Sequence, residues 1–335
     1  MPELRTARTH CQRIVTAAEP GAAAEVTNCL GRTLFVDPQD RRGRRLIDSA
    51  GDANPHSMTM WRDLLLTRPW DLVVDVGANY GEMLLGAHLP KNAEVVAFEP
   101  NENVLPHLRR SVTAAGLPVE VRTSAVSDHR GHGVLLQDRD WSGMSHLSTE
   151  PSADASHSLA EQVCSTTTLD HEFFGSAHRT ACIKIDIEGH EEPAIAGALA
   201  WLDSLDEHAL MIEIMHLTPL QISSMSIRWC MYLRHLRTGR LVRIASCDEA
   251  TVHELVTGGV FYGQDAIFSA TPLAIAGAAE VEERESLLAV IRALDEQIDQ
   301  AREALSESVA QLEQIQASRS WRFPSALRKL GRGSH

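Results

Sequence analysis

The sequence has few cysteines, few aromatic residues and no long hydrophobic run. Six of its 335 residues are cysteine and 5% are aromatic. No two cysteines are close enough for a CxxC pair or a zinc-binding spacing, so the cysteines are expected to be reduced thiols. No stretch reaches the roughly 18 apolar residues that a membrane-spanning helix needs, and the first twenty residues lack the apolar core of a signal peptide. We therefore expect a soluble, cytoplasmic protein.

Basic residues are also scarce. The chain has 31 of them against 45 acidic residues, which gives a formal net charge of -14 at pH 7 and a pI near 5.6. This balance argues against a general affinity for nucleic acid phosphates. The remaining composition, 44% hydrophobic and 23% charged, is ordinary for a globular chain. The length allows one large domain with an appendage, or two domains.

From Asp71 onward, short apolar runs alternate with segments of helical pattern. This alternation is typical of a parallel sheet covered by helices on both faces, an α/β fold. The expected sheet strands are DLVVDVG, AEVVAFEP, VEVRTSAV, CIKIDIEG and ALMIEIMH. We expect LVRIAS (Leu241 to Ser246) and DAIFSA (Asp265 to Ala270) to be two last strands that form an antiparallel edge pair. The polar stretch from Ser127 to Asp170 is predicted to be a loop or hairpin insertion beside the sheet.

The chain is divided into four parts by these patterns. Residues 1–60 are expected to form a small cap with a short strand at Thr33 to Val36 and a basic loop at Arg41 to Arg45. Residues 61–276 form the α/β domain. Residues 278–316 are predicted to be a long helix and residues 317–335 a basic tail.

The predicted C-terminal helix has the pattern of a coiled coil. Apolar residues recur in alternating steps of four and three from Leu287 to Ile315, broken only at Ser308. Isoleucine at presumed a positions and leucine at d positions favour a parallel dimer. A single amphipathic helix packed on the domain is the alternative. Residues 280–316 carry a net charge of -7 and residues 317–335 a net charge of +5.

The strongest chemical signal follows the first strand of the sheet. A dinucleotide-binding loop needs glycines at relative positions one, three and six, whereas this chain has Gly77, Asn79 and Glu82 there. The second strand ends at Glu99, where a carboxylate can accept both hydroxyls of a ribose. Together with Asp75, this predicts an acidic nucleoside site without a phosphate cradle. Such a site suits S-adenosylmethionine, which carries a net positive charge; a generic doubly wound domain is the alternative.

Several of these motifs also resemble a known family. The strings VVDVGANYGE, VVAFEPN, SAVSD, WSGMSHL and KIDIEGHE occur in this order and closely resemble the FkbM family of S-adenosylmethionine-dependent O-methyltransferases. The resemblance covers roughly residues 34–270. It implies a Rossmann-like class I methyltransferase domain, with a seven-stranded, mostly parallel sheet and an antiparallel last strand.

The resemblance also implies roles for individual residues. The methionine half of the cofactor would lie against Asp75, Gly77, Asn79 and Gly81, and the ribose against Glu99. The adenine edge would lie against a further segment, consisting of Ser124, Ala125 and Val126. The motif WSGMSHL departs from the family pattern at Met144 and His146.

Candidate catalytic residues lie at the end of the fourth predicted strand. Asp186 and Glu188 alternate along the chain and His190 follows, so all three are expected at the ligand crevice. Methyl transfer to a hydroxyl requires a carboxylate or an imidazole that takes the proton. Alternatively, Asp186, Glu188 and Glu213 could bind Mg²⁺, which would acidify the hydroxyl.

Further residues are candidates for the substrate side. Glu213 and His216 end the fifth predicted strand on the same rim, and they resemble the family's glutamate and histidine there. Trp141 could stack on a sugar ring, and Ser145 lies in the same motif. A structural role is the alternative for each of them.

The tail indicates an acceptor class. SRSWRFPSALR, residues 318–328, resembles a short tail, SxSWRxTxPLR, of bacterial enzymes that assemble surface polysaccharides, with Pro324 in place of the threonine. Its aromatic and basic residues could contact an anionic membrane or a partner enzyme. We therefore expect O-methylation of a sugar in a bacterial surface glycan or glycolipid. A polyketide or other secondary metabolite is the second expectation, and a non-catalytic scaffold the third.

Overall fold

The computed structural model describes residues 23–138, 140–148, 159–274 and 279–281, together with 298, 300–306 and 308–310. The chain divides into two compact units, residues 1–281 and residues 282–335. All of the named strands and helices belong to the first unit. Among the described residues, no helix is both long and apolar enough to cross a membrane.

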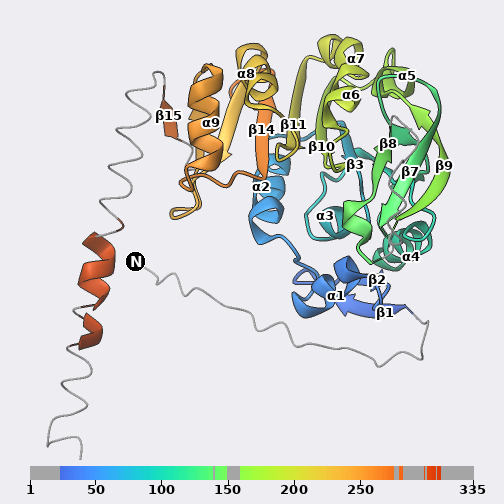
Figure 1. The fold of residues 1–335 in the computed structure, drawn as a ribbon, viewed down its shortest axis with the longest axis horizontal. Coiled ribbons are helices and arrows are strands. Elements are labelled where there is room, and N and C mark those ends of the chain that lie inside the picture. The colour runs from blue at the N-terminus through green and yellow to red at the C-terminus, as the bar shows by residue number, and fades with distance from the viewer. Residues whose placement is uncertain are drawn as a thin grey trace, which may run out of the picture. The chain divides into compact units, whose positions relative to one another are not determined.

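A nine-stranded sheet forms the centre of the first unit (Figure 1). Its order is β15 (Ala279–Val281), β13 (Leu241–Ile244), β12 (Cys230–Arg234), β14 (Asp265–Ser269), β11 (Glu207–Glu213), β10 (Thr180–Ile185), β3 (Leu72–Val76), β4 (Glu94–Phe98) and β5 (Val119–Arg122). From β11 to β5 all neighbours are parallel, and β14 is antiparallel to both β11 and β12. The seven strands from β12 to β5 confirm the predicted α/β class I arrangement, in which the last strand in chain order is antiparallel.

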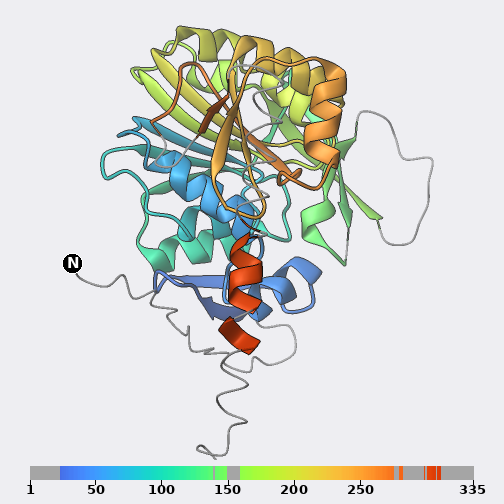
Figure 2. The same ribbon diagram turned by 90° about the vertical axis from the view of Figure 1, so that its left-hand side faces the viewer.

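Helices cover both faces of this sheet, as the alternating pattern predicts (Figure 2). Strands such as β3 are buried along their whole length because helices pack on both faces of the sheet. One group of helices is α2 (Pro55–Leu65), α3 (Glu82–Leu85) and α4 (Leu105–Ala115). The other group is α5 (Leu169–Phe173), α6 (Glu191–Ala196), α7 (Leu199–Ser204), α8 (Pro219–Arg228) and α9 (Glu249–Thr257).

The predicted edge pair of β13 and β14 is wrong. β12, which the sequence patterns did not single out, lies between them and is antiparallel to both. β14 pairs on its other side with β11, where Asp265 faces Glu213. β12 was missed because it begins at Cys230, two residues after α8 ends at Arg228, with no glycine or proline to mark the boundary.

The predicted C-terminal helix is wrong at its start. Residues 279–281 form β15, which adds to the open edge of β13 as a parallel strand. Free backbone groups on an edge strand pair readily with any extended segment that reaches them. The described residues 300–306 and 308–310 are helical. The coiled coil remains a prediction, because most of its predicted seam and the whole tail lie outside the described residues.

The predicted basic loop is also wrong, since Arg41–Asp48 form helix α1. Asp40 caps this helix by accepting a hydrogen bond from the backbone N–H of Gly43. Gly43 packs so tightly that an added Cβ would lie 2.0 Å from the carbonyl oxygen of Asp37. Arginine is a good helix former. With Asp40 as the cap and a glycine at the close contact with Asp37, this arginine-rich segment can form a helix. The hairpin of β1 (Ala24–Thr27) and β2 (Thr33–Val36) precedes it.

The insertion after β5 forms a second, four-stranded sheet. Its order is β6 (Ala125–Val126), β9 (Leu159–Thr167), β7 (Gly131–Asp138) and β8 (His146–Ser148), with a short 3₁₀ helix, η1 (Ser142–Met144), between β7 and β8. The predicted hairpin insertion is therefore present. The predicted strand VEVRTSAV is wrong as a single element, because β5 belongs to the large sheet and β6 to this one. The break brings residues 124–126 to the sheet edge where the site lies.

Candidate functional site

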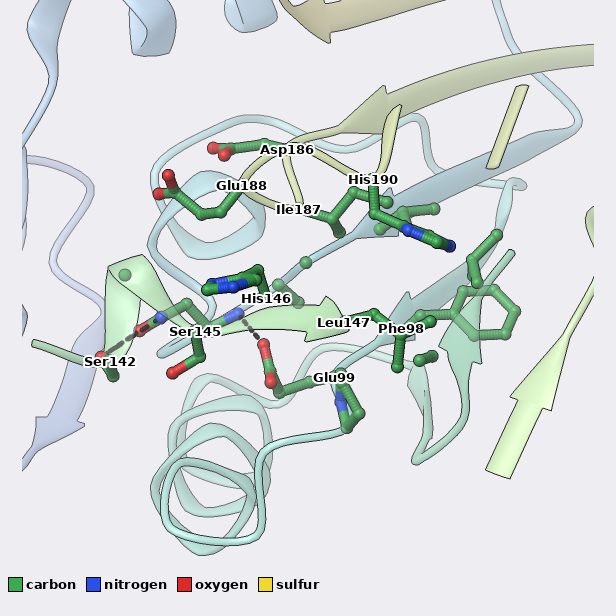
Figure 3. A pocket seen from close by; sticks show the side chains of 18 of the residues that line it. Phe98, Glu99, Ser142, Ser145, His146, Leu147, Asp186, Ile187, Glu188 and His190 are labelled. Atoms are coloured by element: carbon green, nitrogen blue, oxygen red, sulfur yellow. Dashed lines mark hydrogen bonds between the residues drawn. The ribbon is translucent and has the colours of Figure 1, made fainter. Parts of the chain in front are cut away.

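One cavity lies at the carboxyl ends of β3, β4 and β10, and the η1 segment borders it (Figure 3). It holds about 800 Å³ of space, including the part open to solvent. Its walls come from β-strand ends, the loop before α3 and the inserted sheet. The polar residues lining it are Arg42, Asn79, Glu82, Glu99, Ser124, Ser142, Ser145, His146, Lys184, Asp186, Glu188 and His190. The carboxyl ends of the strands are where doubly wound sheets bind their ligands.

The loop after β3 is held in a conformation that suits few other residues. Gly77 has φ of +80°, and an added Cβ would lie 2.0 Å from the carbonyl oxygen of Asp186. The glycine therefore allows close packing of the β3 and β10 ends, as well as lining the cavity. Asn79 also has positive φ and lines the cavity. Gly81 does not line it; its left-handed backbone begins α3.

Glu99 lies across the cavity from Asp186 and Glu188 (Figure 3). One oxygen of its carboxylate accepts a hydrogen bond from the backbone N–H of Asn79 and the other accepts one from the backbone N–H of Asn101, both at 2.8 Å. Burial raises the pKa of Glu99 to about 7, although both backbone donors lower it. Each oxygen keeps a lone pair that can accept a ligand hydroxyl.

Asp75 does not line the cavity, contrary to its predicted contact with the cofactor. Its side chain is 0% exposed, and neither carboxylate oxygen has a hydrogen-bond donor among the described residues. The nearest charge is Lys184 Nζ, 3.4 Å from Asp75 Oδ1. Burial raises the pKa of Asp75 to about 6, and Lys184 lowers it. Asp75 therefore balances the charge of Lys184 from behind the cavity.

The wall opposite the glycine loop is partly apolar. Ala125 and Val126 of β6 line the cavity together with Ser124, and their predicted contact with the adenine stays a prediction. Phe98, Leu135 and Leu147 extend this wall. An apolar slot beside a carboxylate can hold a flat base next to a ribose.

Asp186 and Glu188 both line the cavity, but they differ in proton affinity. Lys184 Nζ lies 3.1 Å from Asp186 Oδ2. Burial opposes ionisation of Asp186, yet Lys184 and Arg42 outweigh it and lower the pKa of this carboxyl. The pKa of Glu188 is raised to about 7 by burial and by the neighbouring Asp186. Near neutral pH, Asp186 is ionised and Glu188 is poised to take or release a proton.

Glu213 and His216 do not line the cavity, but they lie directly behind Glu188. His216 Nε2 is 3.3 Å from Glu188 Oε2 and 3.8 Å from Glu213 Oε2. Burial and the nearby carboxylates raise the pKa of Glu213 to about 10. Asp265 on β14 adds a fourth buried carboxyl, and its pKa is raised to about 7 mainly by burial. Glu213 is therefore protonated at neutral pH.

The predicted Mg²⁺ ligands are not grouped as expected. Potential ligand atoms of Glu188, Glu213 and His216 lie within 4.8 Å of one another, whereas Asp186 is not in this group. Mg²⁺ prefers an octahedral set of oxygen ligands, so a histidine in the group does not fit it well. The bound Mg²⁺ ion remains a prediction.

His190 lines the cavity but points away from the two carboxylates (Figure 3). Its Nε2 lies 2.9 Å from the hydroxyl oxygen of Ser127. Burial lowers the pKa of His190, so the ring is neutral. Glu191, the next residue, accepts hydrogen bonds from the backbone N–H groups of Ile187 and Gly189. These contacts fit a structural role at this turn better than the predicted catalytic role of His190.

The sequence patterns missed the contribution of the N-terminal part. Arg42 of α1 lines the cavity, and its Nε donates a hydrogen bond of 2.8 Å to Glu82 Oε1. Asp40 accepts hydrogen bonds from the hydroxyl of Tyr80 and from the backbone N–H and hydroxyl of Ser142. The basic run at residues 41–45 is visible in the sequence, but the sequence does not indicate which carboxylate pairs with Arg42.

The inserted motif contributes unevenly to the site. Ser145 lines the cavity, as does His146, which the prediction did not include. Trp141 does not line it; the guanidinium of Arg41 lies over its ring, 4.3 Å from the centroid. One face of Trp141 is thus already covered, which argues against the predicted stacking of a sugar on that face.

Comparisons with known proteins agree with this geometry. Residues 75–238 match the family model described as the methyltransferase FkbM domain, which is just under half of the chain. No curated protein matches the chain. This part of the chain is therefore similar to the FkbM methyltransferase domain.

Solved structures include several methyltransferases of low similarity. An O-methyltransferase from Bacillus cereus in complex with SAH is 12% identical, with a TM-score of 0.36, over 66% of this chain and 82% of that one. An rRNA methylase from Streptococcus thermophilus is 14% identical, with a TM-score of 0.32, over 64% of this chain and 92% of that one. Such low identities do not transfer an acceptor or an activity. The family match of this chain is thus to the FkbM methyltransferase domain, over residues 75–238.

Proposed function

We propose that the protein is an S-adenosylmethionine-dependent O-methyltransferase that acts on a hydroxyl group. The observation that supports this most directly is the arrangement of carboxylates around one cavity. Glu99 lies on one side, and Asp186 and Glu188 lie on the other, with the Gly77–Asn79 loop also lining the cavity. The first carboxylate suits a ribose, and the pair suits an acceptor proton.

The residues present fit this cofactor. Glu99 would accept hydrogen bonds from the ribose hydroxyls, and the apolar wall of Phe98, Val126 and Leu135 would take the adenine. The carboxylates leave the cavity acidic, which favours a cationic ligand. When bound, the cofactor supplies an electrophilic methyl group on a sulfonium.

The chain's own contribution to the reaction is the removal of a proton. Glu188 has a pKa of about 7, so near neutral pH it can accept the hydroxyl proton of the acceptor. Asp186 remains ionised because it pairs with Lys184, and its charge keeps the proton affinity of Glu188 high. His216, next to Glu188, would stabilise the ionised form that precedes the transfer. Glu188 is thus the proposed general base.

The proposed acceptor is a sugar hydroxyl in a bacterial surface polysaccharide or glycolipid. The resemblance of the C-terminal tail to those of glycan-assembling enzymes supports this choice. The tail could hold the protein at an anionic membrane or on a partner enzyme. The same core is compatible with a polyketide or another secondary metabolite.

Replacement of Glu99 tests the proposed cofactor site. Glu99→Gln removes the charge and replaces one acceptor oxygen with an NH₂ group, which cannot accept a hydrogen bond from a backbone N–H. We expect the affinity for S-adenosylmethionine, measured by isothermal titration calorimetry, to fall by about tenfold or more, because charge-assisted hydrogen bonds contribute about 1.5–3 kcal/mol. Glu102→Gln removes an exposed carboxylate three residues away and should leave the affinity unchanged.

Two results would contradict the proposal at different levels. Equal affinities in the wild type, Glu99→Gln and Glu102→Gln would remove Glu99 from the ribose site. A wild-type protein that shows no binding of S-adenosylmethionine would contradict the proposed activity as a whole. Binding without methyl transfer to any glycan or metabolite hydroxyl would favour the scaffold.

A further inference from the structure

The basic run at residues 41–45 has no function in the site described so far, apart from Arg42. Four of its five residues are arginines, in a chain whose net charge is -14. In α1, Arg41, Arg44 and Arg45 are exposed, whereas Arg42 turns toward the cavity and Leu46 into the core. Among the described residues, only Arg42 of these four forms an ion pair.

Helical spacing joins these side chains into one surface. At 100° per residue, positions 41, 44 and 45 lie on the same side of α1, and position 42 follows directly after 45 around the helix. The surface formed by Arg41, Arg44 and Arg45, here called the arginine face, therefore continues toward Arg42 and the cavity. Asp48, at the end of α1, is the acidic residue on this side of the helix.

Contacts with the insertion place the arginine face beside the cavity rim. The backbone N–H of Arg41 donates to the carbonyl oxygen of Asp140 at 2.8 Å, and its guanidinium covers Trp141. The next residues, Ser142 and Gly143, line the cavity. The arginine face thus begins one residue from the cavity lining.

Charge inside the cavity determines which end of a ligand can lie there. Asp186 is ionised, and four carboxyl groups line the cavity against two cations: Glu82, Glu99, Asp186 and Glu188 against Arg42 and Lys184. An anionic group on the acceptor would be repelled from this interior, whereas its hydroxyl would be accepted. At the rim, the exposed guanidinium groups of Arg44 and Arg45 offer the planar donor arrangement that binds phosphate or carboxylate oxygens.

We infer that the acceptor carries a phosphate or carboxylate group, which binds to the arginine face while its hydroxyl enters the cavity. This inference rests on the proposed function and specifies its substrate class as an anionic one. The exposed side of α1 has no apolar side chain that would enter a bilayer, which favours an anion of the acceptor over a membrane surface. Neither Arg44 nor Arg45 lines the cavity. In this arrangement they therefore determine which acceptor binds and do not contact the reacting hydroxyl.

The test uses the full-length chain and two charge-matched double variants. R44Q/R45Q removes two charges from the arginine face, and R130Q/R240Q removes two exposed arginines elsewhere on the surface. Inorganic pyrophosphate and trigalacturonate are titrated calorimetrically as probes for the two anion types. S-adenosylmethionine is titrated into every variant.

We expect R44Q/R45Q to weaken the binding of at least one probe by about tenfold, while R130Q/R240Q changes it less than twofold. If R44Q/R45Q weakens the binding of pyrophosphate alone, the anionic group of the acceptor is a phosphate. If it weakens the binding of trigalacturonate alone, the group is a carboxylate. The affinity for S-adenosylmethionine should be the same in all three proteins, because the arginine face lies outside the cavity.

Equal binding of both probes by R44Q/R45Q and R130Q/R240Q would overturn the inference. So would arginine-dependent binding to phosphatidylglycerol vesicles without binding of either probe, which would assign the arginine face to a membrane. Failure to bind S-adenosylmethionine would contradict the proposed function instead, and the probe titrations would remain interpretable on their own.

Discussion

Two carboxylates that are two residues apart have opposite properties in this site. Lys184 holds Asp186 in its ionised form, and the resulting charge, together with burial, raises the pKa of Glu188 to about 7. The alternating positions of these acids are visible in the sequence. Their division of roles depends on Lys184, whose side chain lies between Asp186 and the buried Asp75.

The pH dependence of methyl transfer tests the role of Glu188. A base works in its deprotonated form, so the rate at saturating cofactor should rise with pH and be half-maximal near pH 7. Glu188→Gln should lower the rate by about 100-fold or more and remove this inflection. The variant should bind S-adenosylmethionine as the wild type does.

Glu192→Gln is the matched control, because Glu192 is an exposed carboxylate on the following helix. It should retain both the rate and the inflection. If Glu188→Gln retained them as well, the proton would have to be accepted elsewhere, and the proposed base would be wrong.

At the scale of elements, α1 connects three separate parts of the site. Its capping residue, Asp40, binds the hydroxyl of Tyr80 after β3 and the backbone and hydroxyl of Ser142 in η1. Arg42, two residues later, pairs with Glu82 of α3. A helix outside the matched 75–238 region therefore helps to hold the cavity lining in place.

Asp40→Ala should destabilise the protein more than the loss of an ordinary helix cap. An N-cap is worth about 1 kcal/mol, and Asp40 accepts three further hydrogen bonds at 2.7–2.8 Å. We expect the free energy of unfolding in urea to fall by about 2–4 kcal/mol, because buried donors lose their acceptor. Thr218→Ala, which removes the cap of α8, should cost about 1 kcal/mol. Equal losses in the two variants would show that Asp40 acts only as a cap.

At the scale of the whole molecule, the chain separates after residue 281, whereas the sequence patterns end the α/β domain at residue 276. β15 completes the sheet edge through its pairing with β13, so residues 279–281 belong with the domain. Residues 282–335 form the second unit, which contains most of the predicted coiled-coil seam.

A chain that ends at Val281 tests the predicted coiled coil. It should retain the wild-type affinity for S-adenosylmethionine, because every cavity residue is present, and it should sediment as a monomer while the full chain sediments as a dimer. Ile291→Asp with Ile298→Asp in the full chain should also give a monomer, since charges at a positions destabilise the seam. A truncated chain that sediments as the full chain does would contradict the prediction.

Local pattern determined much of this protein by itself. Apolar runs of strand length, separated by helical segments, are enough to predict the sheet and its helices, because period and turn chemistry act between near neighbours. Parallel strands end at one edge, so Glu99, Asp186 and Glu188 could be predicted at a common site. β12 escaped prediction because only Trp229 separates it from α8, with no glycine or proline to mark a boundary. β15 was assigned to the predicted helix, and pairing with β13 makes it a strand.

Only the tertiary structure decided the electrostatics and the boundaries of the site. The pairing of Arg42 with Glu82 joins residues forty positions apart, and the burial of Asp75 depends on packing from both faces of the sheet. His190 and Trp141 had suitable chemistry for the predicted roles, but their contacts with Ser127 and Arg41 give them others. Composition indicated an acidic chain, whereas the fold placed its carboxylates inside the cavity and three exposed arginines beside the rim. Charge interactions act through space, so their partners follow from the folded path of the chain and not from its order.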